Sequence, residues 1–414
     1  MGQTTNAKTI FFCVAGASFF ALVYLSRHLA STYVNLDRRH MIIPINVSSP
    51  PVAVDLEKSP KCVDLLGAVQ NGFWVSRTPK KKDVIELESC INATRSIHFG
   101  LPPKLQRSDG LCGNLNFGGK MFRALCDPNG PTPCCFEYKC VNKTVGQCNC
   151  STCFDLRPEI HADFGSYVLK EPACKMTTFE SKADACSMLK NVSITFIGDS
   201  LVRQVYTSFL TMLQHKALNK VDRNEFMSNR QQCREQINYL GSSRHVPWGE
   251  VTECNQTVKM QFYKYFKLDR KLQQELLGTV KGLVGKQYSI LYIGLGLHED
   301  LNFQFLHEQV VKPMVNIVGK NQWPKIVWAT PHCPGPLKSP TFIKQQKDSV
   351  IDFIKNMKMI LKGYNIAILD SLPLTTGIVS YDGVHYGKVI NDIKAQILMN
   401  LIQRLRNNGW SRVH

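Results

Sequence analysis

The chain has 414 residues, enough for one large domain together with a smaller one. Its composition, 44% hydrophobic and 20% charged, is that of a globular protein and excludes wholesale disorder. The formal charge of +18 fits a negatively charged glycan as a partner; no zinc-finger or RNA-binding signature accompanies it, so no nucleic acid partner is expected. The densest basic run, Lys80–Lys82, is interpreted as a solvated loop.

The N-terminal segment is predicted to anchor the chain in a membrane. Residues 9–26 are free of charge over eighteen positions and follow Lys8, a length near the lower limit for a transmembrane helix. We favour an uncleaved signal anchor over a cleaved signal peptide, because the small-residue site near Ala30 is poor. Residues 1–8 would then be a cytosolic tail and residues 27–60 a proline-containing stem. This describes a single-pass type II membrane protein facing the Golgi or secretory lumen, or the cell surface.

Sixteen cysteines indicate an oxidising compartment. Disulfides are favoured over a zinc site, since only Cys150-x-x-Cys153 has ligand spacing and no second pair matches it; no metal is expected. Local pairs are suggested by proximity along the chain, and Cys333 is the candidate free thiol. The suggested pairs are Cys62 with Cys90, Cys174 with Cys186, and Cys233 with Cys254.

The N-x-S/T sequons agree with a secretory route. Glycosylation is predicted at Asn46, Asn92, Asn142, Asn191 and Asn255. Asn149 also carries the motif but is flanked by Cys148 and Cys150 and is not counted among them.

Residues 61–160 are predicted to form a small disulfide-rich module. Its stretch 105–157 has few apolar residues, so disulfides must replace a core there. The adjacent Cys134 and Cys135 and their spacing resemble hevein-type chitin-binding modules, in which Phe136 and Tyr138 would supply an aromatic sugar platform. The gap from Cys135 to Cys140 is shorter than in those modules, and a purely structural knot is the alternative.

Residues 186–410 are predicted to form an α/β domain. Strands are expected at 192–198, 259–266, 288–296, 325–330 and 365–370, and helices at 201–216, 270–284, 302–318, 341–361 and 387–405. Strongly apolar strands separated by helices are typical of a mostly parallel sheet covered on both faces. Catalytic residues should then lie at the carboxyl ends of the strands.

Two short motifs occupy such positions. Ser200 follows Gly198-Asp199 at the turn from the first strand into a helix, where its hydroxyl and backbone N–H could act in catalysis; a helix N-cap is the alternative. Asp382 and His385 stand just before the last helix. An Asp three residues before a His can fix the imidazole tautomer, so His385 would be the general base for Ser200.

These residues carry a family resemblance. Residues 198–204 (GDSLVRQ), 296–298 (GLH), 328–338 (WATPHCPGPLK) and 382–386 (DGVHY) resemble the PC-esterase branch of the GDSL/SGNH hydrolase superfamily. That branch includes sialate and plant-wall polysaccharide O-acetyltransferases and neurexophilin-and-PC-esterase-domain proteins. The resemblance covers about half of the chain and implies a three-layer α/β/α fold, with Ser200 as nucleophile, Asp382 and His385 as its partners, and an acyl-serine intermediate.

Four further residues are candidates for oxyanion or substrate binding. The wider superfamily has a Gly-x-Asn-Asp block where this chain has Gly296-Leu297-His298-Glu299, so His298 would replace the asparagine. Gly241 is the candidate for the second oxyanion glycine. Arg203, one helical turn after Ser200, would either bind an anionic substrate or pair with a carboxylate.

The function expected from these features is lumenal O-acetyl transfer to glycan hydroxyls. No bound cofactor is expected, and an acetyl donor such as acetyl-CoA would be a co-substrate. A carbohydrate O-acetyl esterase would use the same three residues. A non-catalytic lectin-like or adhesion protein with a decayed site is the remaining alternative. The expected partners are a glycan or glycoconjugate and, through residues 9–26, a membrane.

Overall fold

The computed structural model describes residues 62–102, 105–214, 239–247, 249–265 and 267–410. The predicted anchor, the stem and Asn46 lie outside these ranges. Among the described residues, no helix combines the length and the apolar character that crossing a bilayer requires. Residues Pro60–His414 form one compact unit. The boundaries proposed within this unit, at 61–160 and 186–410, stay predictions.

A six-stranded sheet with the order β13-β12-β11-β8-β10-β9 forms the centre of this unit. All neighbouring pairs are parallel except β10 with the edge strand β9. This confirms the predicted mostly parallel sheet. The strands are β8 (Ser193–Gly198), β9 (Gly249–Glu253), β10 (Val258–Lys264), β11 (Ser289–Gly294), β12 (Lys325–Ala329) and β13 (Ala367–Leu369).

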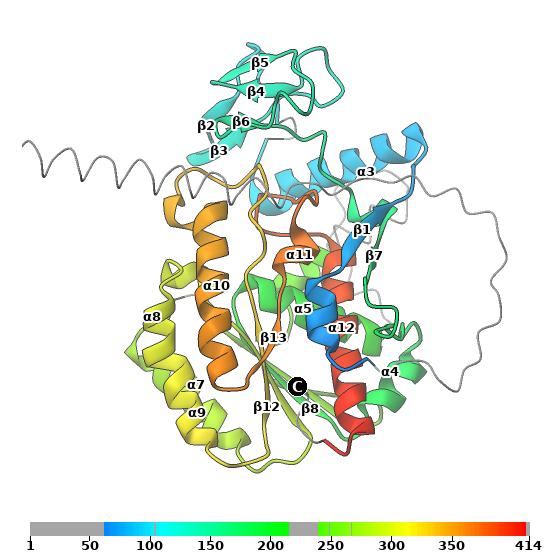
Figure 1. Cartoon of the computed structure of the whole chain (residues 1–414), viewed down its shortest axis with the longest axis vertical. Helices are drawn as coiled ribbons and strands as arrows, with labels where there is room; N and C mark the ends of the chain where they lie inside the picture. Colours follow the sequence, from blue (N-terminus) through cyan, green and yellow to red (C-terminus); the bar gives the residue numbers. More distant parts are fainter. Residues whose placement is uncertain (1–61, 103–104, 215–238, 248, 266, 411–414) are drawn as a thin grey trace, which may run out of the picture. The chain divides into compact units, whose positions relative to one another are not determined.

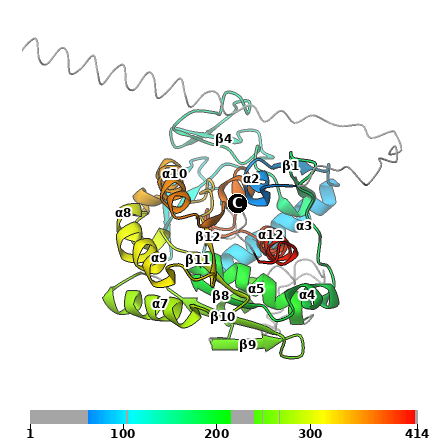
Figure 2. The ribbon, with the colours of Figure 1, turned by 60° about the horizontal axis from the view of Figure 1, so that its bottom comes forward.

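Helices cover both faces of the sheet, as the apolar strands predict (Figures 1 and 2). Successive side chains of β8 point to opposite faces, so Phe196 and Ile197 join different apolar clusters. The cluster around Phe196 contains residues of α4 (Lys182–Leu189), α5 (Ser200–Gln214) and α12 (Lys388–Asn407). The cluster around Ile197 contains residues of α7 (Arg270–Leu283), α9 (Lys312–Val318) and α10 (Lys347–Gly363). Three layers result.

Two predicted helices differ in detail. The helix expected from residue 341 begins at Lys347, after a 3-10 turn (η6, Ile343–Gln345) whose Gln345 donates to the Leu297 carbonyl at 2.7 Å. The helix expected over 302–318 is divided into α8 (Phe303–Leu306), a π-helical turn (η5, His307–Val311) and α9. Pro313 has no N–H for the Gln309 carbonyl, which accepts from the Gln273 side chain at 2.7 Å instead.

The N-terminal part of the compact unit consists of α2 (Leu65–Gln70), β1 (Phe73–Ser76), α3 (Lys81–Thr94) and a π-helical turn, η2 (Arg95–Phe99). Strand β1 pairs antiparallel with β7 (Gly165–Val168), which follows the 3-10 turn η3 (Ala162–Phe164). The Trp74 indole donates to the Leu374 carbonyl of α11 (Leu372–Thr375) at 3.1 Å. The loop interpretation of Lys80–Lys82 was wrong: the three side chains are exposed, but Lys80 is the N-cap of α3.

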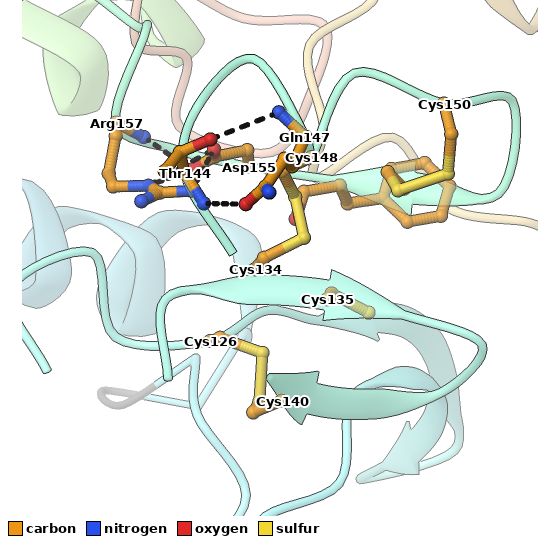
Figure 3. Close-up of a disulfide and its surroundings, with 12 residues drawn as sticks. Cys126, Cys134, Cys135, Cys140, Thr144, Gln147, Cys148, Cys150, Asp155 and Arg157 are labelled. Carbon is orange, nitrogen blue, oxygen red and sulfur yellow. Dashed lines mark hydrogen bonds and ion pairs between the residues drawn. A yellow bond between two sulfur atoms is a disulfide. The ribbon is translucent and has the colours of Figure 1, made fainter. Parts of the chain in front are cut away.

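Disulfides hold the cysteine-rich stretch together, as predicted (Figure 3). Its strands are short: β2 (Gly113–Phe117), β3 (Lys120–Ala124), β4 (Cys134–Phe136), β5 (Lys139–Val141) and β6 (Cys153–Phe154). The bonds join Cys112 with Cys135, Cys126 with Cys140, Cys134 with Cys148, and Cys150 with Cys153. Four bonds within about forty residues take the place of an apolar core.

The local pairings suggested outside this stretch were wrong. Cys62 is bonded to Cys174, and Cys186 to Cys254. The fold explains the second bond: the Asn191 N–H donates to the Thr257 carbonyl at 2.8 Å, so the end of α4 lies beside the β9–β10 turn. Among the described residues Cys333 is the free cysteine, which confirms that prediction.

Candidate active site

Ser200 is the first residue of α5, and Asp199 alone separates it from the end of the central strand β8. The turn requires glycine at position 198, because a Cβ there would lie 2.4 Å from the Gly294 carbonyl oxygen and 2.5 Å from Val202 Cγ2. Asp199, not Ser200, caps the helix: its Oδ1 accepts from the Leu201 N–H at 2.8 Å. The Ser200 hydroxyl is therefore free for another partner.

That partner is His385. Ser200 Oγ lies 2.7 Å from His385 Nε2, and His385 Nδ1 lies 2.8 Å from Asp382 Oδ2. The other carboxylate oxygen of Asp382 accepts from the backbone N–H groups of Val384 at 3.0 Å and His385 at 2.8 Å. The turn thus fixes the carboxylate, and the carboxylate fixes the imidazole with Nδ1–H directed to it and Nε2 directed to the hydroxyl.

The charge of Asp382 is stabilised despite burial. Burial alone would raise the pKa of this carboxyl, but the attraction to His385, the hydrogen bond to its ring and two backbone N–H donors lower the pKa to about 2. Asp382 is consequently ionised at every pH at which the protein would work. An ionised Asp382 favours the imidazolium that forms when His385 takes the Ser200 proton.

Arg95, on the π-helical turn η2, holds the turn that carries Asp382, and sequence analysis missed it. The Arg95 guanidinium is buried and donates to the carbonyl oxygens of Tyr381 at 2.8 Å and Ser380 at 2.9 Å, and to Asn92 Oδ1 at 2.9 Å. Burial lowers the pKa of Arg95 to about 10, which still leaves it charged at neutral pH. No motif in the sequence links residues so far apart.

Phe99, at the end of the same turn, forms a wall of the site. Its ring lies 5.2 Å from the His385 ring and stacks on Tyr381 at 6.0 Å, measured between centroids. The Phe99 ring therefore shields one side of the imidazole from solvent. Together with Arg95 it makes residues far upstream of the α/β domain part of the site.

A buried polar network lies behind the three residues. Lys394 Nζ on α12 lies 2.9 Å from His332 Nε2, and His332 Nδ1 donates to the Val384 carbonyl at 2.8 Å. Burial, followed by the charge of Lys394, lowers the pKa of His332 well below its usual value, and burial lowers the pKa of Lys394 to about 7. Burial also raises the pKa of Asp199, which lines a cavity of about 10 Å³ with Lys394. A neutral His332 that donates from Nδ1 fits this network.

The other predicted site residues are placed less directly. Gly296 is buried at the end of β11, and its N–H donates to Glu299 Oε2 at 3.0 Å. Glu299, which the sequence analysis did not assign, also accepts from the Leu268 N–H at 3.1 Å, and burial raises its pKa to about 7. His298 is exposed, and it lies near enough to Asp199 that its charge stabilises the ionised form of the Asp199 carboxyl. Within the described ranges, no hydrogen bond joins Gly241 to Ser200.

The predicted sugar platform and glycosylation sites differ in exposure. Tyr138 is 66% exposed, whereas Phe136 is partly buried under Lys143, whose Nζ lies 3.6 Å from the ring centroid. Asn142, Asn191 and Asn255 are exposed. The Asn92 side chain is partly buried and accepts from Arg95.

The geometry as a whole can perform one kind of chemistry. A serine hydroxyl in contact with an imidazole, which a half-buried carboxylate orients, is the arrangement that serves nucleophilic acyl transfer on several unrelated folds. Ser200 lies at a helix N-terminus, where backbone N–H groups without intrahelical partners can stabilise negative charge. Ser200, His385 and Asp382 therefore have the geometry of a Ser-His-Asp triad and form a candidate active site at the carboxyl edge of the parallel sheet.

Among solved structures, two esterases resemble part of this chain at low sequence identity. One is the carbohydrate acetylesterase Est24 from Sinorhizobium meliloti, at 12% identity over 52% of this chain and 99% of that one, with a TM-score of 0.30. Another is the aryl esterase of M. smegmatis in its inhibitor-bound form, with 12% identity, the same two coverages and a TM-score of 0.29. No family model and no curated protein matches the chain. The description of the fold and of the candidate triad therefore depends on the structure of this chain and not on these comparisons.

Proposed function

We propose that this protein is a lumenal O-acyltransferase of the PC-esterase branch of the SGNH superfamily, which transfers acetyl groups to glycan hydroxyls through an acyl-serine. The observation that carries the proposal is the 2.7 Å contact between Ser200 Oγ and His385 Nε2, with Asp382 behind the imidazole. Disulfides such as Cys62–Cys174 support a compartment that is oxidising. The type II anchor over residues 9–26 belongs to the same proposal.

In the first half-reaction, Ser200 Oγ attacks the carbonyl carbon of the acetyl donor while His385 Nε2 takes the hydroxyl proton. The tetrahedral oxyanion is stabilised by the backbone N–H of Ser200, with His298 and Gly241 as further candidates. The predicted role of Gly296 does not fit, because its N–H already donates to Glu299 Oε2. As the bond to the leaving group breaks, His385 returns the proton to that group. The product is an acetyl ester on Ser200, and an acetyl thioester such as acetyl-CoA is a suitable donor.

In the second half-reaction, the acceptor hydroxyl gives its proton to His385 Nε2 and attacks the acetyl-serine carbonyl. The Ser200–acyl bond breaks, Ser200 recovers the proton, and the sugar carries the new ester. Throughout the cycle Asp382 stays ionised and balances the transient imidazolium. Atoms and charge balance without a metal or a redox cofactor.

Hydrolysis is the second candidate, and one observation favours it. The side chains of His385 and Asp382 retain 19% and 21% of their exposure, so water can reach the imidazole that would activate it. If water replaces the sugar hydroxyl, the same residues make a carbohydrate O-acetyl esterase. A non-catalytic lectin-like protein is disfavoured because Ser200, His385 and Asp382 are connected by hydrogen bonds.

A fluorophosphonate probe tests the nucleophile. The wild-type chain should be labelled at Ser200, Ser200→Ala should not be labelled, and Ser187→Ala, an exposed serine of α4, should be labelled as the wild type is. Labelling of Ser200→Ala at the wild-type level would refute the assignment. Mass spectrometry of glycans incubated with and without an acetyl donor then separates the two reactions: transfer adds one acetyl mass to the sugar, and hydrolysis removes one.

A further inference from the structure

Two arginines lie around the candidate active site, Arg203 on the helix of Ser200 and Arg244 beside Phe99, and neither is paired with a carboxylate among the described residues. Arg203 follows Ser200 by three residues on α5, so the two side chains share one face of the helix. Arg203 Nε is buried and has no hydrogen-bond partner in the described part of the chain. A buried N–H without a partner is destabilising, and such a group is commonly explained by a ligand or an ion.

Arg244 reaches the same region from a different element. It is exposed at the end of the helical segment 239–244, and its Nη2 donates to the His98 carbonyl. The guanidinium carbon lies 5.8 Å from the Phe99 ring centroid. Since Phe99 itself contacts the His385 ring, Arg244 lies two contacts away from the imidazole.

The two guanidinium groups are near enough to repel each other. Burial, and then the charge of Arg244, lowers the pKa of Arg203, and the weaker attraction to Asp199 offsets this only in part. Burial and the charge of Arg203 likewise lower the pKa of Lys264, at the end of β10. Across the ranges that the structure describes, no ion pair joins either arginine to a carboxylate. Like charges held together beside a reactive serine leave a local positive excess that an anion would neutralise.

We propose that Arg203 and Arg244 form an anion subsite that binds a carboxylate on the sugar whose ester or hydroxyl reacts at Ser200. This deepens the proposed function and rests on it: the substrate class becomes an acidic glycan. The planar guanidinium fork matches the two oxygens of a carboxylate, and Arg203 Nε supplies one donor of that fork. Arg203 holds the acid group one helical turn from the nucleophile, which fixes the distance between acid and reacting oxygen.

The test uses the full chain and a matched pair of substrates: an O-acetylated uronic acid glycoside and the same compound with its carboxylate replaced by carboxamide. The wild type should prefer the acid by about tenfold or more in kcat/KM for acetate release, since a charge-assisted hydrogen bond contributes at least that ratio. The ratio of kcat/KM for the acid to kcat/KM for the carboxamide should fall to near one in Arg203→Gln and in Arg244→Gln. Arg270→Gln, an exposed arginine at the start of α7, should keep the wild-type ratio.

An equal ratio in wild type and in both variants would overturn the subsite. Because Arg244 is exposed, its variant decides the question even if Arg203→Gln fails to fold. Calorimetric titration of the unacetylated acid and amide sugars requires no turnover, so it separates failure of the subsite from failure of the proposed reaction. Tighter binding of a sulfated sugar than of the uronic acid would assign the arginines to sulfate and contradict the carboxylate.

Discussion

The ring of Phe99 packs 5.2 Å from the ring of His385, so the imidazole of the candidate triad is shielded by a residue outside the parallel sheet and its helices. Phe99 reaches this position because the π-helical turn η2 ends there and because Arg95, four residues earlier, is bonded to the carbonyls of Ser380 and Tyr381. The turn η2 therefore contacts the segment 380–385 twice: Arg95 bonds to its backbone, and Phe99 packs against its imidazole.

Removal of this aromatic wall should reduce turnover. In Phe99→Ala the imidazole loses its neighbour and can leave the position that faces Ser200, and misplacement by about 1 Å can cost as much as about 10²-fold in rate. We expect kcat for aryl acetate to fall by about tenfold or more. Phe117→Ala, at an exposed position of β2, is the control. A normal kcat in Phe99→Ala would show that the wall is dispensable.

Loss of the Arg95 guanidinium should affect both stability and activity. Arg95→Met leaves two buried carbonyl groups without a donor, each costing about 1–3 kcal/mol. Because these carbonyls immediately precede Asp382, the rate should fall as well. Arg404→Met is the matched control, since Arg404 donates to the Cys62 carbonyl at 2.9 Å. Chemical denaturation and steady-state kinetics should show a stability loss in both variants and a loss of kcat in Arg95→Met alone.

Replacement of the orienting carboxylate should nearly abolish catalysis. Asp382→Asn keeps the shape of the side chain but removes the charge that balances the imidazolium, and the equivalent change in a serine protease triad lowers kcat by about 10⁴-fold. Since the pKa of Asp382 is about 2, the wild-type carboxylate stays charged down to acidic pH. Protonation of Asp382 should thus add no limb to the pH–rate profile between pH 4 and 9. A near-normal rate in Asp382→Asn would exclude this role.

Stability should depend on pH through the buried lysine of α12. The pKa of Lys394 is lowered to about 7 in the folded chain from 10.5, so between these values the unfolded state binds more protons. The free energy of unfolding should therefore rise with pH over this window, and the dependence should weaken in Lys394→Met. Denaturant titrations at pH 7 and pH 9 give the change of unfolding free energy with pH for the wild type and for Lys394→Met. Equal slopes in wild type and Lys394→Met would contradict a neutral buried lysine.

The free cysteine should be inert in the folded protein. Cys333 is buried, and burial raises its pKa, so little thiolate is available to react. Iodoacetamide should leave Cys333 unmodified under native conditions and label it after denaturation without reduction. Peptide mapping under non-reducing conditions identifies the labelled residue, and an intrachain disulfide at Cys333 would overturn the assignment.

The α/β region was predictable because its signals are local. Apolar runs such as that of β8 are buried on both faces, and amphipathic runs such as that of α5 present one apolar face, so a mostly parallel sheet with helices on both faces follows from the sequence. The order of the strands and the antiparallel edge strand β9 were not predicted. The proximity of Ser200 to Asp382 and His385 was predictable for the same reason, since strand ends meet at one edge of a parallel sheet.

What the sequence could not supply is the set of contacts between distant segments. The disulfides Cys62–Cys174 and Cys186–Cys254 and the hydrogen bonds of Arg95 depend on how separate elements pack. A buried arginine that pairs with carbonyl groups has no sequence signature, because its partners are main-chain atoms that any residue provides. Proximity along the chain was the wrong guide to disulfide pairing once folding brought remote turns together.

The bond between Arg95 and the carbonyl of Tyr381 has a consequence for biosynthesis. The ribosome makes Arg95 early and the loop that accepts its hydrogen bonds near the end, so a nascent chain carries this arginine without those two carbonyl acceptors through most of translation. Domains of this size often fold through partly structured states, and here the hydrogen bonds of Arg95 can form only after Ser380 and Tyr381 have been made. A chain that ends before Ser380 would lack these acceptors and the His385 ring, so the Arg95 guanidinium and the Phe99 ring would both be without their partners.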